Sequence, residues 1–151
     1  MTDEQAKELN RFFVETFHQI LAWEERALNA TGLPDLSVKE LHILDATFRL
    51  GQREEHTMSQ IAAALGISVG ALTTAVNTLV KKGYLSRAGR AEDRRIVLLE
   101  LTESGRRANE MHGVFHGEMI ARVGAVLQET ELETLTGSLR RLSDFFKNLD
   151  L

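Results

Sequence analysis

Residues 58–79 read MSQIAAALGISVGALTTAVNTL, and the expected fold can be worked out from them. Two helices that cross must bury the apolar side chains at their contact, which here are Ile61, Leu65, Ile67, Leu72 and Ala75. Ala62 lies at the expected contact, where a larger side chain would push the helices apart. Gly66 lies at the turn, where glycine tolerates a positive φ angle. The pattern predicts a helix-turn-helix, and a plain helical hairpin is the alternative.

Helix boundaries are marked by capping boxes, in which Ser or Thr is followed three residues later by Glu or Gln. Three such pairs are Ser37/Glu40, Thr57/Gln60 and Thr130/Glu133. The helix after Ser37 is expected to turn Leu41, Leu44 and Phe48 inward. Ser68 is expected to cap the second helix of the helix-turn-helix, which Gly83 ends. Two longer helices are predicted, from Gln5 to Ala30 and from Thr102 to Gln128.

Two short strands, Tyr84–Ala88 and Arg95–Leu101, are predicted on either side of a polar turn, Gly89–Arg94. A hairpin that follows a helix-turn-helix is a wing. The predicted fold is therefore mostly α with a small β-hairpin wing. Residues 35–101 are expected to form the winged helix-turn-helix domain, with N-terminal (1–34) and C-terminal (102–151) dimerisation helices on either side.

The last helix carries apolar residues at alternating steps of three and four, which is a heptad seam. Its members are Leu132, Leu135, Leu139, Leu142, Phe146 and Leu149. A wide apolar stripe also runs along the first helix, through Leu9, Phe13, Phe17, Ile20 and Leu21. Both helices lie outside the central domain, so these faces predict a homodimer. Packing within the same chain is the alternative.

The helix that Ser68 opens has two different faces. Leu72, Val76, Leu79 and Val80 are expected to point inward. The outward face is small and polar and has no carboxylate to repel phosphates; it comprises Ser68, Val69, Gly70, Thr73, Thr74, Asn77, Thr78 and Lys81. Thr methyl groups suit thymine methyls and Asn can pair with adenine. The N–H groups at the Ser68 end suit a phosphate. This face is expected to contact double-stranded DNA.

Charge is distributed unevenly along the chain. The net charge is −4, but Ser68–Val97 holds six basic and two acidic residues, so the remainder is at −8. A basic segment on an acidic body is typical of a DNA-binding protein. The wing supplies Arg87, Arg90, Arg94 and Arg95. We expect Arg95 to enter a narrow A·T minor groove, held by Asp93, although Arg94 or Arg90 is an alternative. A solvated turn with internal ion pairs is the other interpretation.

Composition excludes several other classes of function. The chain has no Cys, so it forms no disulfide, thiolate zinc finger or thiol nucleophile. It has no apolar run of membrane-spanning length and no signal-peptide layout, so we expect a cytoplasmic protein. His112 and His116 lack the H-E-x-x-H arrangement of a metallohydrolase, and Ser104 lacks a nucleophile elbow. We expect no enzyme activity and no cofactor. An alternative function is a helix-turn-helix scaffold that binds protein instead of DNA.

The chain resembles the MarR family of winged-helix transcriptional regulators over essentially its full length. The most specific motifs are Asp93-x-Arg95, Leu101-Thr102-x-x-Gly105 and Leu79-x-x-x-Gly83-Tyr84-Leu85. The resemblance implies a homodimer that reads a palindromic operator and usually represses, under control of a small molecule. The chain departs from many members in having Thr74 and Thr78 where they have Arg. It also lacks the cysteine of the family's peroxide-sensing branch.

Within that family the chain is most similar to repressors of bacterial fatty-acid synthesis genes. This similarity rests on Glu24-Glu25, residues 36–42 (LSVKELH), residues 70–74 (GALTT) and His112-x-x-x-His116. It implies a long-chain acyl group, delivered on acyl carrier protein, as corepressor.

The histidines allow three interpretations. They can line an effector pocket whose expected members are Phe13, Phe17, Glu24, His42, Leu44, Met111, His112 and His116. The i, i+4 spacing of His112 and His116 also lets both rings approach one metal ion, and zinc-responsive members of the family resemble this chain in using Glu and His from the helices that hold Glu24 and His42. The third possibility is that the histidines are purely structural.

Overall fold

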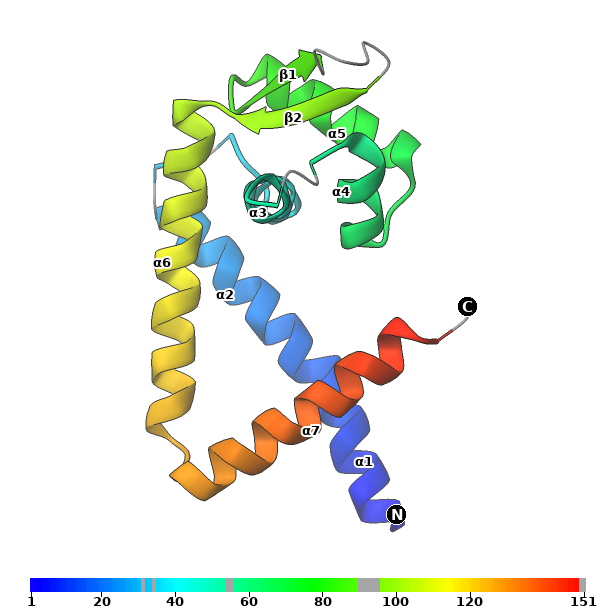
Figure 1. The fold of residues 1–151 in the computed structure, drawn as a ribbon. Helices are drawn as coiled ribbons and strands as arrows, with labels where there is room; N and C mark the ends of the chain where they lie inside the picture. Colours follow the sequence, from blue (N-terminus) through cyan, green and yellow to red (C-terminus); the bar gives the residue numbers. More distant parts are fainter. Residues whose placement is uncertain (31, 34, 54–55, 90–95, 150–151) are drawn as a thin grey trace. The chain divides into compact units, whose positions relative to one another are not determined.

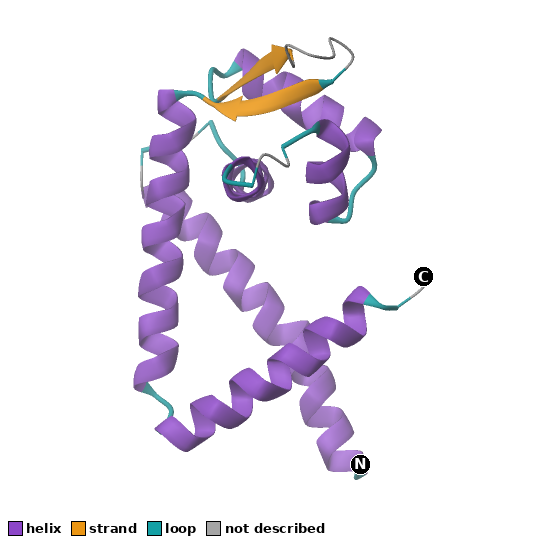
Figure 2. Cartoon of the chain, viewed as in Figure 1, coloured by secondary structure: helices purple, strands orange, loops and turns teal. Residues whose placement is uncertain are grey.

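A computed structural model describes residues 1–149 of the chain, apart from 31, 34, 54–55 and 90–95. The described part is mostly helical and includes one two-stranded antiparallel sheet (Figure 1, Figure 2). This confirms the predicted fold class. The chain divides into two compact units, Met1–Gly113 and Val114–Leu151. The domain borders predicted at residues 34/35 and 101/102 stay a prediction.

The first unit holds most of the elements. In chain order they are α1 (Asp3–Arg11), η1 (Phe12–Thr16), α2 (Phe17–Ala30), α3 (Val38–Gly51), α4 (Met58–Leu65), α5 (Val69–Lys81), β1 (Leu85–Gly89), β2 (Val97–Leu101) and the first part of α6 (Glu103–Ala125). Together α1, η1 and α2 account for the helix predicted from Gln5 to Ala30. The π-helical turn η1 within it was not predicted.

The predicted caps of α3 and α4 are confirmed. The Ser37 hydroxyl accepts a hydrogen bond from the Glu40 amide at 3.3 Å, and the Glu40 carboxylate accepts one from the Ser37 amide at 2.8 Å. Thr57 and Gln60 form the same reciprocal pair at the start of α4. Each box therefore satisfies backbone donors that the first helical turn would leave unpaired.

Helices α4 and α5 form the predicted helix-turn-helix, with an angle of 107° between them. Gly66 ends α4 at φ 65°, in the left-handed region that favours glycine. The core joins α3, α4, α5 and the sheet through fully buried side chains such as Leu44, Ile61, Leu72, Leu79, Leu85 and Leu99. Two residues predicted to face inward are exposed instead: Ile67 at 39% and Phe48 at 41%. Ile67 lies in the turn between helices, and Phe48 lies at the edge of the packed face of α3.

The wing hairpin is confirmed: Leu85 pairs with Leu101 at one end of the sheet and Gly89 pairs with Val97 at the other. The predicted bounds are shifted, because Tyr84 precedes β1 and Gly89, predicted to lie in the turn, is the last residue of β1. Gly83 precedes the hairpin at φ 82°. The hairpin is also attached to the helix-turn-helix, because Leu98 forms a β-bridge with Thr57. The bridge therefore joins β2 to the residue that caps α4.

The second unit contains the remainder of α6 and α7 (Glu129–Lys147). The capping box predicted at Thr130/Glu133 is wrong. Helix α7 begins two residues earlier, where the Glu131 carboxylate accepts a hydrogen bond from the Gln128 amide at 2.8 Å. No residue of α7 is buried in the single chain, so its apolar seam remains accessible.

Within the described ranges, no single helix is both long and apolar enough to cross a membrane. Helices α4 and α5 reach that threshold when taken together, but they are the bent pair described above.

Candidate functional site

The predicted two faces of α5 are confirmed. Leu72, Val76 and Leu79 are fully buried, while the opposite side of the helix reaches solvent. We call this opposite side the recognition face and define it by Ser68, Val69, Gly70, Thr73, Thr74, Asn77, Thr78 and Lys81; all are exposed except Thr73, which is half-buried. No carboxylate lies on this face, so an anionic ligand would meet no repulsion from α5 itself.

Hydroxyl groups on the recognition face are already engaged with backbone. Thr73 donates to the Val69 carbonyl at 2.7 Å, and Thr74 donates to the Gly70 carbonyl at 3.3 Å. Thr78 donates to the Thr74 carbonyl at 3.3 Å, and the Ser68 hydroxyl accepts from the Ala71 amide at 3.2 Å. Because the threonine protons point along the helix, these residues offer methyl groups and oxygen lone pairs outward.

The wing contributes a cation to the same surface. Arg87 of β1 donates from Nη2 to Oδ1 of Asn77 on α5, at 2.6 Å, and both side chains are exposed. Arg90, Asp93, Arg94 and Arg95 lie outside the described residues. Their assignment to the wing tip, and the choice among the arginines for the minor groove, stay predictions.

A network at the other end of α5 fixes that helix to α3. Lys82 donates from Nζ to both carboxylate oxygens of Glu40, at 2.8 and 2.9 Å, and also to the Asp35 carbonyl. The Tyr84 hydroxyl donates to the Asp35 carboxylate at 2.9 Å. Sequence reasoning identified Glu40 as a cap but missed Lys82, Asp35 and the Tyr84 hydroxyl, since local spacing carries no signal for contacts more than 40 residues apart.

Two pKa values in this network are shifted. Burial alone would raise the pKa of the Glu40 carboxyl, but hydrogen bonds from Lys82 and Ser37, with the Lys82 charge, hold that pKa below its ordinary value. Burial raises the pKa of the Tyr84 hydroxyl, and the neighbouring Asp35 carboxylate raises it further. The Glu40 carboxyl is thus kept ionised and the Tyr84 phenol neutral, which matches the hydrogen bonds that they form.

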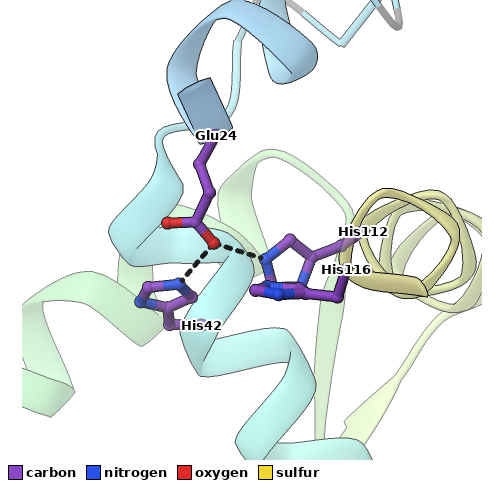
Figure 3. A group of neighbouring side chains, drawn as sticks. All are labelled: Glu24, His42, His112 and His116. Carbon is purple, nitrogen blue, oxygen red and sulfur yellow. Dashed lines mark hydrogen bonds and ion pairs between the residues drawn. The ribbon is translucent and has the colours of Figure 1, made fainter. Parts of the chain in front are cut away.

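A second polar group lies where α2, α3 and α6 meet in the first unit. The buried Glu24 carboxylate directs one oxygen, Oε1, at Nε2 of His42 (3.3 Å) and at Nε2 of the buried His112 (3.4 Å). The two imidazole rings lie with centroids 5.5 Å apart. Figure 3 shows these side chains pointing toward one another, with His116 one helical turn beyond His112 on α6. Within the first unit, the structure therefore brings together three of the four residues that were predicted to share a metal site, whereas His116 belongs to the second unit.

The chemistry of this donor set fits a zinc ion. One ligand atom from each of Glu24, His42 and His112 lies within 4.8 Å of the others. Bonds of about 2.1 Å in a tetrahedron place neighbouring ligand atoms about 3.4 Å apart, which is already the Glu24–His42 and Glu24–His112 spacing. Imidazole nitrogens and carboxylate oxygens are ordinary zinc ligands. The same atoms also fit imidazole–carboxylate hydrogen bonds.

The remaining predicted pocket residues lie in different surroundings. Phe13 on η1 and Phe17 at the start of α2 are exposed, whereas Leu44 is fully buried in the core. Met111 lines a cavity of about 290 Å³, together with Gly32, Leu33, Tyr84, Ser104 and Arg107. Their grouping into one effector pocket stays a prediction.

Comparisons with known proteins agree with this architecture. The sequence pattern of the MarR family matches residues 36–97. Over 108 residues the chain is 32% identical to the transcriptional regulator AdcR of Streptococcus pneumoniae serotype 2 (strain D39 / NCTC 7466), covering 71% of each protein. It is 29% identical over 100 residues to the uncharacterized HTH-type transcriptional regulator YhbI of Bacillus subtilis (strain 168). That match covers 64% of this chain and 65% of YhbI, so the chain spans just under two thirds of that relative.

A solved structure resembles nearly the whole chain. It is the crystal structure of Streptococcus pneumoniae FabT in complex with DNA, with a TM-score of 0.88 and 31% sequence identity. The similarity covers 96% of this chain and 99% of that one.

Proposed function

The chain belongs to the MarR family of DNA-binding transcriptional regulators, and from this premise we propose that it is a repressor that binds a palindromic operator as a homodimer. The recognition face carries this proposal: an exposed, carboxylate-free surface on the second helix of a helix-turn-helix, beside Arg87 of the wing. Small side chains there allow the helix to enter a major groove, and the arginines of the wing supply charge for phosphates.

Two accessible apolar surfaces support the homodimer. One is the seam of α7, which has no buried residue in the single chain. The other lies on η1 and the start of α2, where Phe12, Phe13, Val14 and Phe17 are exposed. A two-fold dimer would place two recognition helices in successive major grooves, about 34 Å apart.

We further propose that an acyl chain, carried on acyl carrier protein, controls the repressor as part of fatty-acid synthesis. The motifs that resemble the fatty-acid branch of the family support this assignment. Burial of a long acyl chain would contribute about 0.8 kcal/mol for each CH₂ removed from water.

Sequencing of the genomic fragments that the purified protein captures tests both steps. The proposal expects enrichment of one short palindrome near promoters, with an affinity for it that changes when long-chain acyl carrier protein is added. Capture without any enriched sequence would contradict the repressor. If a palindrome is enriched but the affinity for it does not change when acyl carrier protein is added, only the proposed effector would be contradicted.

A zinc-responsive regulator is the second candidate function, and the convergence of Glu24, His42 and His112 is the observation that favours it. A bound zinc ion would hold α2, α3 and α6 together at one point. The ion pair between Glu40 of α3 and Lys82, at the end of α5, would connect this point to the helix that carries the recognition face. Calorimetric titration with zinc is expected to show one strong site in the wild type and none in His112→Ala. The exposed His18 provides the control, since His18→Ala should bind zinc as the wild type does.

Operator affinity separates the two candidates. A zinc-responsive regulator changes its operator affinity when a chelator is added, whatever acyl carrier protein is present. Zinc binding that leaves operator affinity unchanged would contradict this second function.

A further inference from the structure

The pairing of Arg87 with Asn77 has a consequence for which base the recognition helix can read. We propose that these two residues act together as a guanine reader: Asn77 contacts the base, and Arg87 both positions it and adds a second donor. The inference rests on the proposed function, because it concerns the sequence of the DNA that the recognition face contacts.

An unpartnered asparagine favours adenine. Its Oδ1 accepts a hydrogen bond from the adenine N6 amino group, while its Nδ2 donates to adenine N7. In this structure Oδ1 of Asn77 already accepts a hydrogen bond from Arg87 Nη2, at 2.6 Å. Hydrogen bonds from a charged donor are short and roughly twice as strong as neutral ones. One of the two lone pairs of the oxygen that adenine would need is therefore engaged.

Apart from the second lone pair of Asn77 Oδ1, the groups that the pair can still present are donors. Asn77 retains its two Nδ2–H groups, and the Arg87 guanidinium has five N–H groups, of which one is used on Asn77. Guanine presents two neighbouring acceptors in the major groove, N7 and O6. Adenine instead presents an acceptor beside the N6 amino group, which would meet a donor of the pair. The donor array thus fits guanine and disfavours adenine.

The rest of α5 offers few other donors near Asn77. Among residues 69–81, Asn77 and Lys81 alone have side-chain N–H groups. Thr74 and Thr78 direct their hydroxyl protons to backbone carbonyls, so they contribute methyl groups and lone pairs. A preference for guanine would therefore depend on the Arg87–Asn77 pair.

The experiment uses the full-length protein and a duplex selected from an operator library randomised over the half-site. Wild type is expected to prefer guanine over adenine at one base pair by about tenfold, the size of one bidentate contact. Arg87→Met keeps most of the side-chain length, removes the donors and frees Oδ1 of Asn77. It should reverse or abolish the preference at that base pair and leave the other positions unchanged. Asn77→Ala should abolish discrimination at the same base pair.

Two further variants separate base reading from general charge. Arg87→Lys retains the charge but loses the planar fork, so it should weaken the guanine preference. Arg49→Met removes the same charge from an exposed residue of α3 that pairs with Asp45, and it should keep the wild-type preference.

Three results would overturn the inference. One is a wild-type preference for adenine at the position that Asn77→Ala affects. Another is a uniform loss of affinity in Arg87→Met across all bases, which would make Arg87 a phosphate contact. The third is an absence of any selected sequence, which would refute the proposed repressor and the guanine reader with it; the first two leave the repressor intact.

Discussion

Gly105 lies at a close contact between the start of the wing and the start of α6. A Cβ atom at this position would overlap the carbonyl oxygen of Tyr84, which is backbone and cannot move aside cheaply. The same carbonyl accepts a hydrogen bond from the Thr102 amide at 3.1 Å. Tyr84, Thr102 and Gly105 therefore form one close contact between the start of the wing and the start of α6.

Gly105→Ala is expected to destabilise the protein by about 1–3 kcal/mol because of this overlap. Gly113→Ala is the matched control on the same helix, since a Cβ there meets no atom within 4 Å. It should stabilise by about 0.5–1 kcal/mol, as alanine does in a helix. Chemical unfolding at one protein concentration measures both, and equal effects of the two variants would contradict the packing described.

The Glu40–Lys82 pair predicts a pH dependence of stability. Since the folded state lowers the pKa of Glu40, the pair stabilises the protein above the ordinary carboxyl pKa. That stabilisation is lost as the pH falls through the lowered pKa. Glu40→Gln keeps the capping box, because Gln also serves at that position. It should cost about 1 kcal/mol at neutral pH and flatten the acid limb of the stability curve. An acid limb unchanged in Glu40→Gln would show that other groups cause it.

Residue roles set by local spacing could be predicted from the sequence, and roles set by distant contacts could not. The caps at Ser37 and Thr57 and the inward positions of α5 follow from patterns a few residues long. Lys82, which contacts Glu40 across 42 positions, has no such pattern. Arg87 was predicted as a DNA contact, but its bond to Asn77 depends on where β1 lies beside α5.

At the scale of an element, the wing supplies the most direct test of DNA contact. Arg95→Ala is expected to weaken binding to an A·T-flanked operator by about 1–3 kcal/mol, since an arginine in a narrow minor groove meets an enhanced negative potential. Fluorescence anisotropy with matched G·C-flanked DNA measures the dependence on flanking sequence. Unchanged affinity in Arg95→Ala, with a loss in Arg94→Ala or Arg90→Ala, would reassign the groove contact.

Element boundaries were predicted well where a glycine or a capping box marks them. Gly66 has the positive φ angle expected of it, and Gly83, which was expected to end α5, also has a positive φ angle. The box at Thr130 was wrong because Gln128 and Glu131 offer an equivalent start two residues earlier. The turn η1 has no local signal, since a π-helical turn differs from an α-helical one by a single inserted residue. Phe48 and Ile67 were wrongly predicted to be buried. Whether these side chains are covered depends on the tertiary packing of neighbouring elements, which local spacing does not encode.

At the scale of the whole molecule, the homodimer depends on the α7 seam. Leu135→Glu and Leu142→Glu each place a charge in the seam, and the double variant is expected to be monomeric in sedimentation velocity. Thr134→Glu adds the same charge on an exposed side of α7 and should leave the dimer intact. A double variant that still sediments as a dimer would refute the seam as the interface.

The net charge of the whole chain indicated its binding partner only when the charge of each segment was considered separately. The net charge of −4 argues against a nucleic-acid partner, whereas the basic segment Ser68–Val97 argues for one. Family membership and the similarity to a DNA-bound relative agree with the basic segment. The operator sequence and the identity of the effector depend on contacts with other molecules, and the sequence of this chain alone does not determine them.

The salt dependence of operator binding is the most direct measurement of the central claim, that the recognition face and wing of each chain bind duplex DNA. Each phosphate contact contributes about −0.9 to the slope of log affinity against log salt concentration. With both wings of a dimer engaged, affinity for the selected operator should fall steeply as the salt concentration rises. An affinity that stays flat across the same salt range would contradict the account.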